Sequence, residues 1–156
     1  MSRMPVVFVG HGSPMNAIED NAYSRGWREM AKRIPKPKAI VSVSAHWYTR
    51  GTRIMDEENP EAIYDMYGFP KELYEVTYNA PGSPEIAKAV KELISREIQF
   101  DNSWGIDHGT WSVLVHMYPE RDVPVFQVSI DAYAPPAVHY NIGKELKALR
   151  DQGVLI

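Results

Sequence analysis

VVFVGHGSP at residues 6–14 and IVSVSAHWY at residues 40–48 are the two stretches that decide the fold. Each is rich in β-branched residues, as in a buried strand, and each reaches a histidine, His11 in the first and His46 in the second. The carboxyl ends of neighbouring parallel strands lie on one edge of a sheet, where open α/β folds build their sites. A lone histidine at a strand end is more often structural, but this pair shares small neighbours that leave room for a ligand. We therefore expect His11 and His46 to converge on one ligand or one metal ion.

The composition is typical of one globular domain. The chain has 156 residues, of which 44% are hydrophobic, enough for one sizeable core and too few for two independent enzymatic domains. The net charge is −3 and no basic run occurs, so we expect no nucleic-acid partner and no membrane surface. Cysteine is absent, which excludes disulfides and thiolate ligands and leaves histidine, carboxylate or water to hold a metal. The first residues resemble neither a signal peptide nor a membrane span, and they predict a cytoplasmic protein.

Segments with strand and helix patterns alternate along the chain. This order predicts an α/β domain with a doubly wound, mainly parallel or mixed sheet, helices on both faces and the site at the carboxyl edge of the strands. The aromatic stretch at residues 59–81 gives no clear prediction. The predicted strands are 6–9, 38–43, 52–55, 98–100 and 123–130, and the predicted helices are 16–33, 83–95, 111–117 and 136–152.

The apolar run at residues 154–156 predicts the beginning of another buried strand. An exposed apolar strand is a liability that natural proteins avoid. We therefore expect residues 1–156 to be the front part of a longer chain.

The other histidines differ in their surroundings. His108 follows Asp107 in the glycine- and tryptophan-rich loop WGIDHGTW at residues 104–111, where it is suited to proton transfer near neutral pH. The alternative is that Asp107 and His108 only cap the following helix. His116 lies among apolar residues, and His139 lies in the first turns of the last predicted helix; both are interpreted as structural.

Four ordered stretches resemble the LigB-type class III extradiol ring-cleavage dioxygenases, and the similarity is closest to their 4,5-DOPA dioxygenase subfamily. The stretches are HGSP at 11–14, SAHWY at 44–48, the segment 68–84 and WGIDHGTW at 104–111. The resemblance covers essentially the whole chain. It implies a non-haem Fe(II) enzyme that opens a catechol ring beside its two hydroxyls with both atoms of O₂. Zn(II) would bind the same imidazoles without supplying the redox step.

By motif, the resemblance implies that His11 and His46 are metal ligands and that His108 is the acid/base histidine. It also implies that residues 1–156 are the N-terminal part of a single α/β catalytic domain, and that the missing C-terminal remainder of this domain supplies further ligands. The partners are then a small catechol and O₂. The motif neighbours that we expect to contact the catechol are Ser13, Trp47, Tyr48 and Asp107.

Two other functions compete with this interpretation. A tetrapyrrole metal chelatase also places a histidine after its first strand in a similar sequence context, but its chemistry needs neither His46-Trp47 nor the Asp107-His108-Gly109 loop. A non-catalytic, metal-binding LigB-like protein is the second alternative, although retention of both His11 and His46 argues against loss of the metal.

Overall fold

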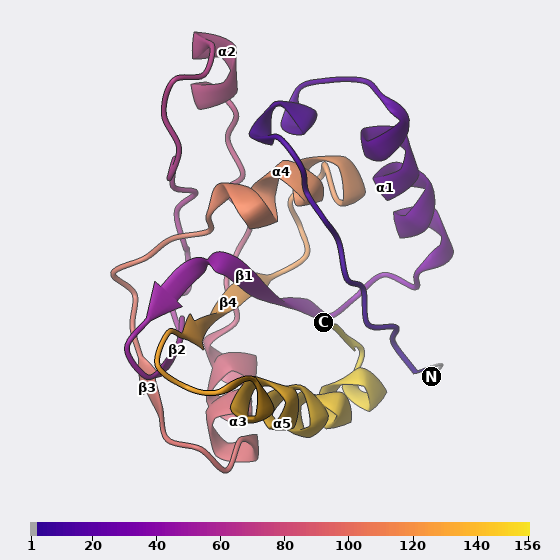
Figure 1. Ribbon diagram of the computed structural model, residues 1–156. Coiled ribbons are helices and arrows are strands. Elements are labelled where there is room, and N and C mark those ends of the chain that lie inside the picture. Colours follow the sequence, from indigo (N-terminus) through magenta and orange to yellow (C-terminus); the bar gives the residue numbers. More distant parts are fainter. Residues whose placement is uncertain (1–2) are drawn as a thin grey trace.

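The computed structural model describes residues 3–156 and places one five-stranded sheet in them, in the order β3-β2-β4-β1-β5 (Figure 1). Strand β1 pairs in parallel with β4 on one side and with β5 on the other. Strand β2 is antiparallel to β4 and parallel to β3. The sheet is therefore mixed and mainly parallel, which confirms the predicted class. The strands are β1 (Ala39–Thr49), β2 (Thr52–Ile54), β3 (Ile98–Phe100), β4 (Val125–Asp131) and β5 (Val154–Leu155).

Strand β1 is longer than the sequence predicted, because it continues past an irregularity. It pairs regularly with β4 from Ile40 to Val43, and the register then shifts before pairing resumes at Tyr48. Extra residues in one strand bend it and change the direction of its side chains. His46 lies within this irregular stretch and not beyond the end of the strand.

Helices cover both faces of the sheet. Figure 1 shows α1 and α4 on one face and α3 and α5 on the other. The predicted helix at 16–33 is interrupted: Asn21 caps α1 by accepting hydrogen bonds from the backbone N–H groups of Tyr23 and Ser24, so α1 begins only at Ala22. The helical elements are η1 (Pro14–Ala17), α1 (Ala22–Arg33), α2 (Lys71–Tyr74), α3 (Pro84–Leu93), α4 (His108–Met117), α5 (Pro136–Leu146) and η2 (Lys147–Gln152). Among the described residues, no helix combines the length and the apolar character needed to cross a membrane.

The predicted strand at residues 6–9 is wrong. This segment is extended but belongs to no sheet, and in Figure 1 it is drawn as an indigo coil without a strand arrow. The backbone N–H of Val7 donates to the carbonyl of Ile156, at 2.8 Å, but no ladder forms, and the Phe8 side chain is fully exposed. A strand needs a partner along several residues, and the end of β5 offers this segment too little backbone to pair with.

The aromatic stretch at residues 59–81 is mostly irregular and packs against the loop that precedes α4. Ala62 forms an isolated parallel bridge with Ile106. The indole N–H of Trp111, which is completely buried, donates to the carbonyl of Ile63 at 2.9 Å. These contacts fix the neighbouring residues of the stretch against the first turn of α4.

Candidate metal centre

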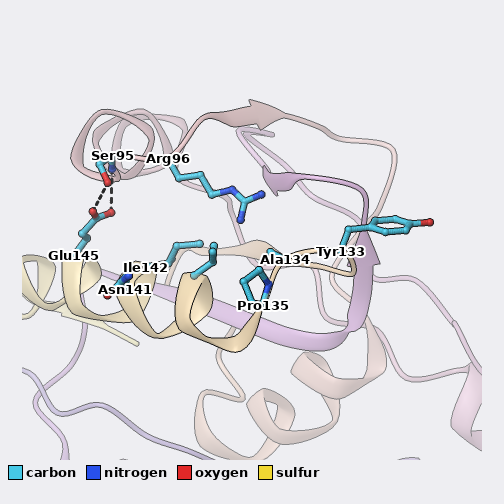
Figure 2. Close-up of a pocket in the computed structure, with 9 residues that line it drawn as sticks. Ser95, Arg96, Tyr133, Ala134, Pro135, Asn141, Ile142 and Glu145 are labelled. Carbon is cyan, nitrogen blue, oxygen red and sulfur yellow. Dashed lines mark hydrogen bonds between the residues drawn. The ribbon is translucent and has the colours of Figure 1, made fainter.

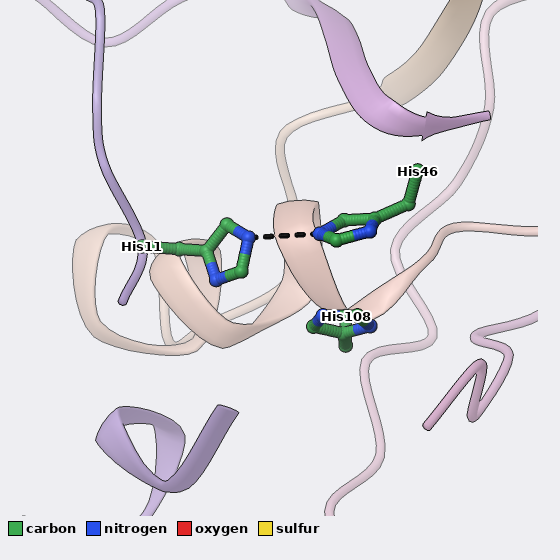
Figure 3. Close-up of side chains that lie close together, drawn as sticks. All are labelled: His11, His46 and His108. Atoms are coloured by element: carbon green, nitrogen blue, oxygen red, sulfur yellow. Dashed lines mark hydrogen bonds between the residues drawn. The ribbon is translucent and has the colours of Figure 1, made fainter. Parts of the chain in front are cut away.

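Three histidines from distant parts of the chain converge at one point (Figure 3). His11 follows the extended N-terminal segment, His46 lies in the irregular part of β1, and His108 is the first residue of α4. The Nε2 atoms of His11 and His46 are 2.9 Å apart. One nitrogen from each of the three rings lies within 4.8 Å of the others. The predicted convergence of His11 and His46 is therefore observed, and His108 joins them.

His11 is held at a tight turn. Gly12 has φ +64°, a left-handed conformation that glycine adopts without the steric cost of a side chain. The next residue, Ser13, caps η1, and its Oγ accepts a hydrogen bond from the backbone N–H of Met15 at 3.2 Å. The hydroxyl of Ser13 thus has a local structural role. Its predicted contact with the catechol stays a prediction.

His46 packs directly against the first turn of α4, and Gly109 permits this approach. A Cβ atom added at Gly109 would lie 2.7 Å from Cδ2 of His46 and 3.0 Å from Oγ of Ser44. The ring centroids of His46 and His108 are 4.1 Å apart. A side chain at position 109 would therefore force His46 or its neighbours to shift.

His108 is paired with a carboxylate that the sequence analysis did not identify. The backbone N–H of His108 donates to Oδ1 of Asp65 at 2.9 Å, and Nδ1 of its ring lies 2.9 Å from the same oxygen, off the direction of a hydrogen bond. Burial raises the pKa of Asp65, but the contacts with His108 outweigh this effect and hold the pKa below its usual value. The ionised carboxylate occupies the Nδ1 side of the ring, so Nε2 is the nitrogen available to the cluster.

Asp107 lies behind the histidines and is completely buried. Its carboxylate accepts hydrogen bonds from Ser44 Oγ at 2.7 Å, Gln127 Nε2 at 2.9 Å and Trp104 Nε1 at 3.0 Å. Asp107 is the N-cap residue of α4, as the capping alternative expects, but its side chain makes no capping hydrogen bond. This arrangement favours a structural role in fixing the loop before α4, and direct contact with substrate stays a prediction.

The cluster has the properties of a divalent metal site. Burial lowers the pKa of His11 below its usual value, and the nearby His108 and His46 rings lower it further. Neutral imidazole is the form that binds a metal. In addition, Nδ1 of His11 is buried without a hydrogen-bond partner. Three imidazole nitrogens at this spacing therefore fit a divalent first-row metal ion.

The histidines lie at one end of an apolar groove. The groove has a volume of about 620 Å³ and is lined by the segment 6–12, by β1 from Ile40 to His46, by β5 and by the helix α4. The other predicted substrate contacts are not among its lining residues: Trp47 is buried in the core and Tyr48 is 65% exposed.

Comparison with known proteins decides the family. The model of the family described as the catalytic LigB subunit of aromatic ring-opening dioxygenase matches residues 2–156. The chain belongs to this family. It is 49% identical to a 4,5-DOPA dioxygenase extradiol of Escherichia coli strain K12, over 99% of this chain and 58% of that protein. It is 41% identical to a protein of the same description from Beta vulgaris, over 96% of this chain and 58% of that protein.

A solved structure supports the LigB fold. The crystal structure of an uncharacterized protein from Escherichia coli K12 superposes with a TM-score of 0.81 at 45% identity, and the match covers 98% of this chain and 58% of that one. This LigB chain therefore spans less than two thirds of the length of the relatives that it matches.

A second cavity, of about 470 Å³, lies between the end of α3 and the start of α5 (Figure 2). Two of its polar side chains already have partners: Arg96 is ion-paired with Asp131, and Ser95 donates to Glu145 at 2.5 Å. His139 accepts a hydrogen bond from the backbone N–H of Asp131 at 3.1 Å, as expected for a structural histidine. This cavity contributes nothing to the metal centre.

Proposed function

We propose that this chain carries the metal-binding part of an extradiol dioxygenase that opens a catechol ring such as that of DOPA. The observation that carries the proposal is the convergence of His11, His46 and His108 at the end of an apolar groove. The printed names of the relatives and the aromatic ring-opening family support it. Ring opening places both atoms of O₂ in the product, so this reaction needs no external reductant. Membership of this family disfavours the chelatase alternative.

His11 and His46 are proposed to hold the metal, which we expect to be Fe(II). A bound Fe(II) ion would supply the redox chemistry, which Zn(II) at the same imidazoles does not. The two histidines that would hold the metal both line the groove, one on the turn after residues 6–10 and one on β1. The apolar groove would exclude water from the ring of the catechol.

His108 is proposed to hold and return the proton that a catechol hydroxyl releases. Oδ1 of Asp65 lies 2.9 Å from Nδ1 of the ring, which leaves Nε2 for the proton transfer. A histidine with one ring nitrogen beside a carboxylate and the other near the reacting oxygen is suited to general acid/base catalysis.

We further propose that residues 1–156 are the N-terminal part of a single α/β catalytic domain. The relatives are longer, and β1 has no strand partner beyond Ile40 on the side of β5 among the described residues. We expect a further ligand to come from outside this segment, since His11 and His46 alone leave a metal with few protein ligands.

The proposed function is tested with Fe(II) and catechol under anaerobic conditions. The protein should take up one equivalent of Fe(II), and catechol should then change its absorption spectrum. His11→Ala and His46→Ala should abolish both effects, whereas His139→Ala, which removes a histidine from the opposite face, should abolish neither. Binding of Fe(II) that is the same in all four proteins would refute the proposed metal centre.

A further inference from the structure

The position of His11 is fixed by the residues that follow it and not by the segment before it. The segment before it forms no strand, and two of its apolar side chains are exposed: Phe8 fully and Val6 to 56%. A metal ligand must nevertheless be held in a defined place to bind tightly. The residues that follow His11 make defined contacts. These contacts involve two buried polar side chains, Asn16 and His116.

Asn16 fastens the turn that carries His11. Its Nδ2 donates to the backbone carbonyl of His11 at 3.0 Å, and its Oδ1 accepts from Nδ2 of Asn21 at 2.7 Å. A Cβ atom at Gly12 would lie 3.0 Å from the same Nδ2, so the approach is close. The side chain of Asn16 thus connects the His11 turn to the N-terminal cap of α1.

His116 holds Asn16 from the other side. Its Nε2 lies 2.7 Å from the backbone carbonyl oxygen of Asn16, and its Nδ1 lies 2.9 Å from Nη2 of Arg28. A guanidinium only donates, so Nδ1 must accept and the proton of the neutral ring must be on Nε2. The N–H at Nε2 then donates to Asn16. Arg28 itself is anchored by Asp20 at 3.2 Å.

We propose that His116 and Asn16 are positioning residues for the metal ligand His11. Residues of α4 and α1 set the place of His11 through this chain of hydrogen bonds, in which Arg28 selects the tautomer of His116. These hydrogen bonds start from the helix that also carries His108, because α4 begins with His108 and contains His116. The same helix therefore places one histidine of the cluster directly and a second one through Asn16. This inference rests on the proposed metal centre.

The test compares Co(II) affinity and the visible spectrum of bound Co(II) in four variants. His116→Leu removes the donor to Asn16, and Asn16→Asp removes the donor to His11 while keeping its shape. Loss of such outer hydrogen bonds typically weakens metal binding by about 10- to 100-fold, and we expect both variants to fall in this range with an altered spectrum. His116→Gln can still donate to Asn16 and accept from Arg28, so it should restore the parent affinity. His139→Leu, which removes another histidine bonded to backbone, should leave affinity unchanged.

Hydrogen exchange in the metal-free protein separates this inference from the proposed function. The amides of Asn16 and Ile18 are bonded within η1, and they should exchange faster in His116→Leu but not in His116→Gln. If the parent protein bound no Co(II), the proposed metal centre would fail, and exchange would still decide whether His116 holds the turn. Parent-like Co(II) affinity in folded His116→Leu and Asn16→Asp would overturn the inference. Should His116→Leu not fold, Asn16→Asp and His116→Gln decide the question.

Discussion

At the scale of single residues, the cluster depends on contacts that leave no room for additional atoms. Gly109 is the clearest case, because the absence of a side chain lets His46 pack on the first turn of α4. Gly109→Ala should destabilise the protein by about 1 to 3 kcal/mol, the usual cost of overpacking, and should weaken Co(II) binding. Gly143→Ala is the matched control. It also lies in a helix, but nothing is within 4 Å of its added Cβ, so it should stabilise by about 0.4 to 1 kcal/mol. Denaturant unfolding measures both, and equal effects would refute the argument.

The role of His108 is also decided at this scale. If it transfers a proton and is not a ligand, His108→Gln should keep nearly normal metal content and lower turnover by about 10² to 10⁴-fold, as for other general acids and bases. Metal analysis and catechol-dependent O₂ uptake, in a chain long enough to turn over, measure the two properties. Loss of metal in this variant would make His108 a third ligand, and unchanged turnover would leave it without a chemical role.

At the scale of elements, the sequence predicted the strands and helices whose signals are local. The β-branched runs of β1 and β4 and the serine–proline start of α3 are such signals. The strand at residues 6–9 was wrong because pairing requires a partner elsewhere in the chain, which no local pattern reveals. Asp65 was missed for a similar reason. It lies in an irregular aromatic stretch, and only the packing of that stretch on the loop before α4 brings it to His108.

The end of β4 is stabilised by Asp131, and this gives a prediction about pH. A hydrogen bond from the backbone N–H of Tyr133 lowers the pKa of Asp131, and the guanidinium of Arg96 lowers it further. A carboxylate with a lowered folded-state pKa stabilises the protein above its unfolded value near 3.8, and this contribution is lost as the pH falls through the lower, folded value. Asp131→Asn should therefore melt at a lower temperature than the parent at pH 6, and the difference should shrink toward pH 3. A difference independent of pH would show that the charge is unimportant.

At the scale of the whole molecule, the histidine cluster lies at a groove between residues 6–12, which join no sheet, and the edge of β1 that faces them. The groove separates residues 6–12 from β1, and β5 enters it between them: Leu155 pairs with Ile40, and Ile156 accepts a hydrogen bond from Val7. Continuing β5 in the same register would bring an added strand alongside Val43 and toward His46. One face of that strand would pack on the apolar side chains of α4 that line the groove. Asn16 thus fixes the turn after His11, whereas the segment before His11 borders the open groove.

The last prediction follows from this open side of His11. We expect the groove to be filled by a strand that continues β5, supplied by the part of the relatives that this chain does not match. Fusing that part of the Escherichia coli 4,5-DOPA dioxygenase after Ile156 should slow amide exchange at residues 6–12 and 41–46, because new backbone hydrogen bonds would form there. Exchange in α1, which contributes no residue to the lining of the groove, should not change. The fusion should also bind Fe(II) more tightly and consume O₂ with catechol, whereas residues 1–156 alone should show little or no turnover.

A matched pair of substitutions distinguishes filling of the groove from a general effect of the longer chain. Phe8 lines the groove and Tyr23 lies on α1, and both side chains are exposed, at 100% and 67%. Exposed substitutions usually change stability by no more than about 0.5 kcal/mol, so Phe8→Asp and Tyr23→Asp should both be tolerated in residues 1–156. In the fusion, only Phe8→Asp should lower the melting temperature, because a charge would then face the added strand in an apolar groove. Full activity of residues 1–156 alone would instead place every essential ligand within this segment, with His108, the third member of the cluster, as the first to test.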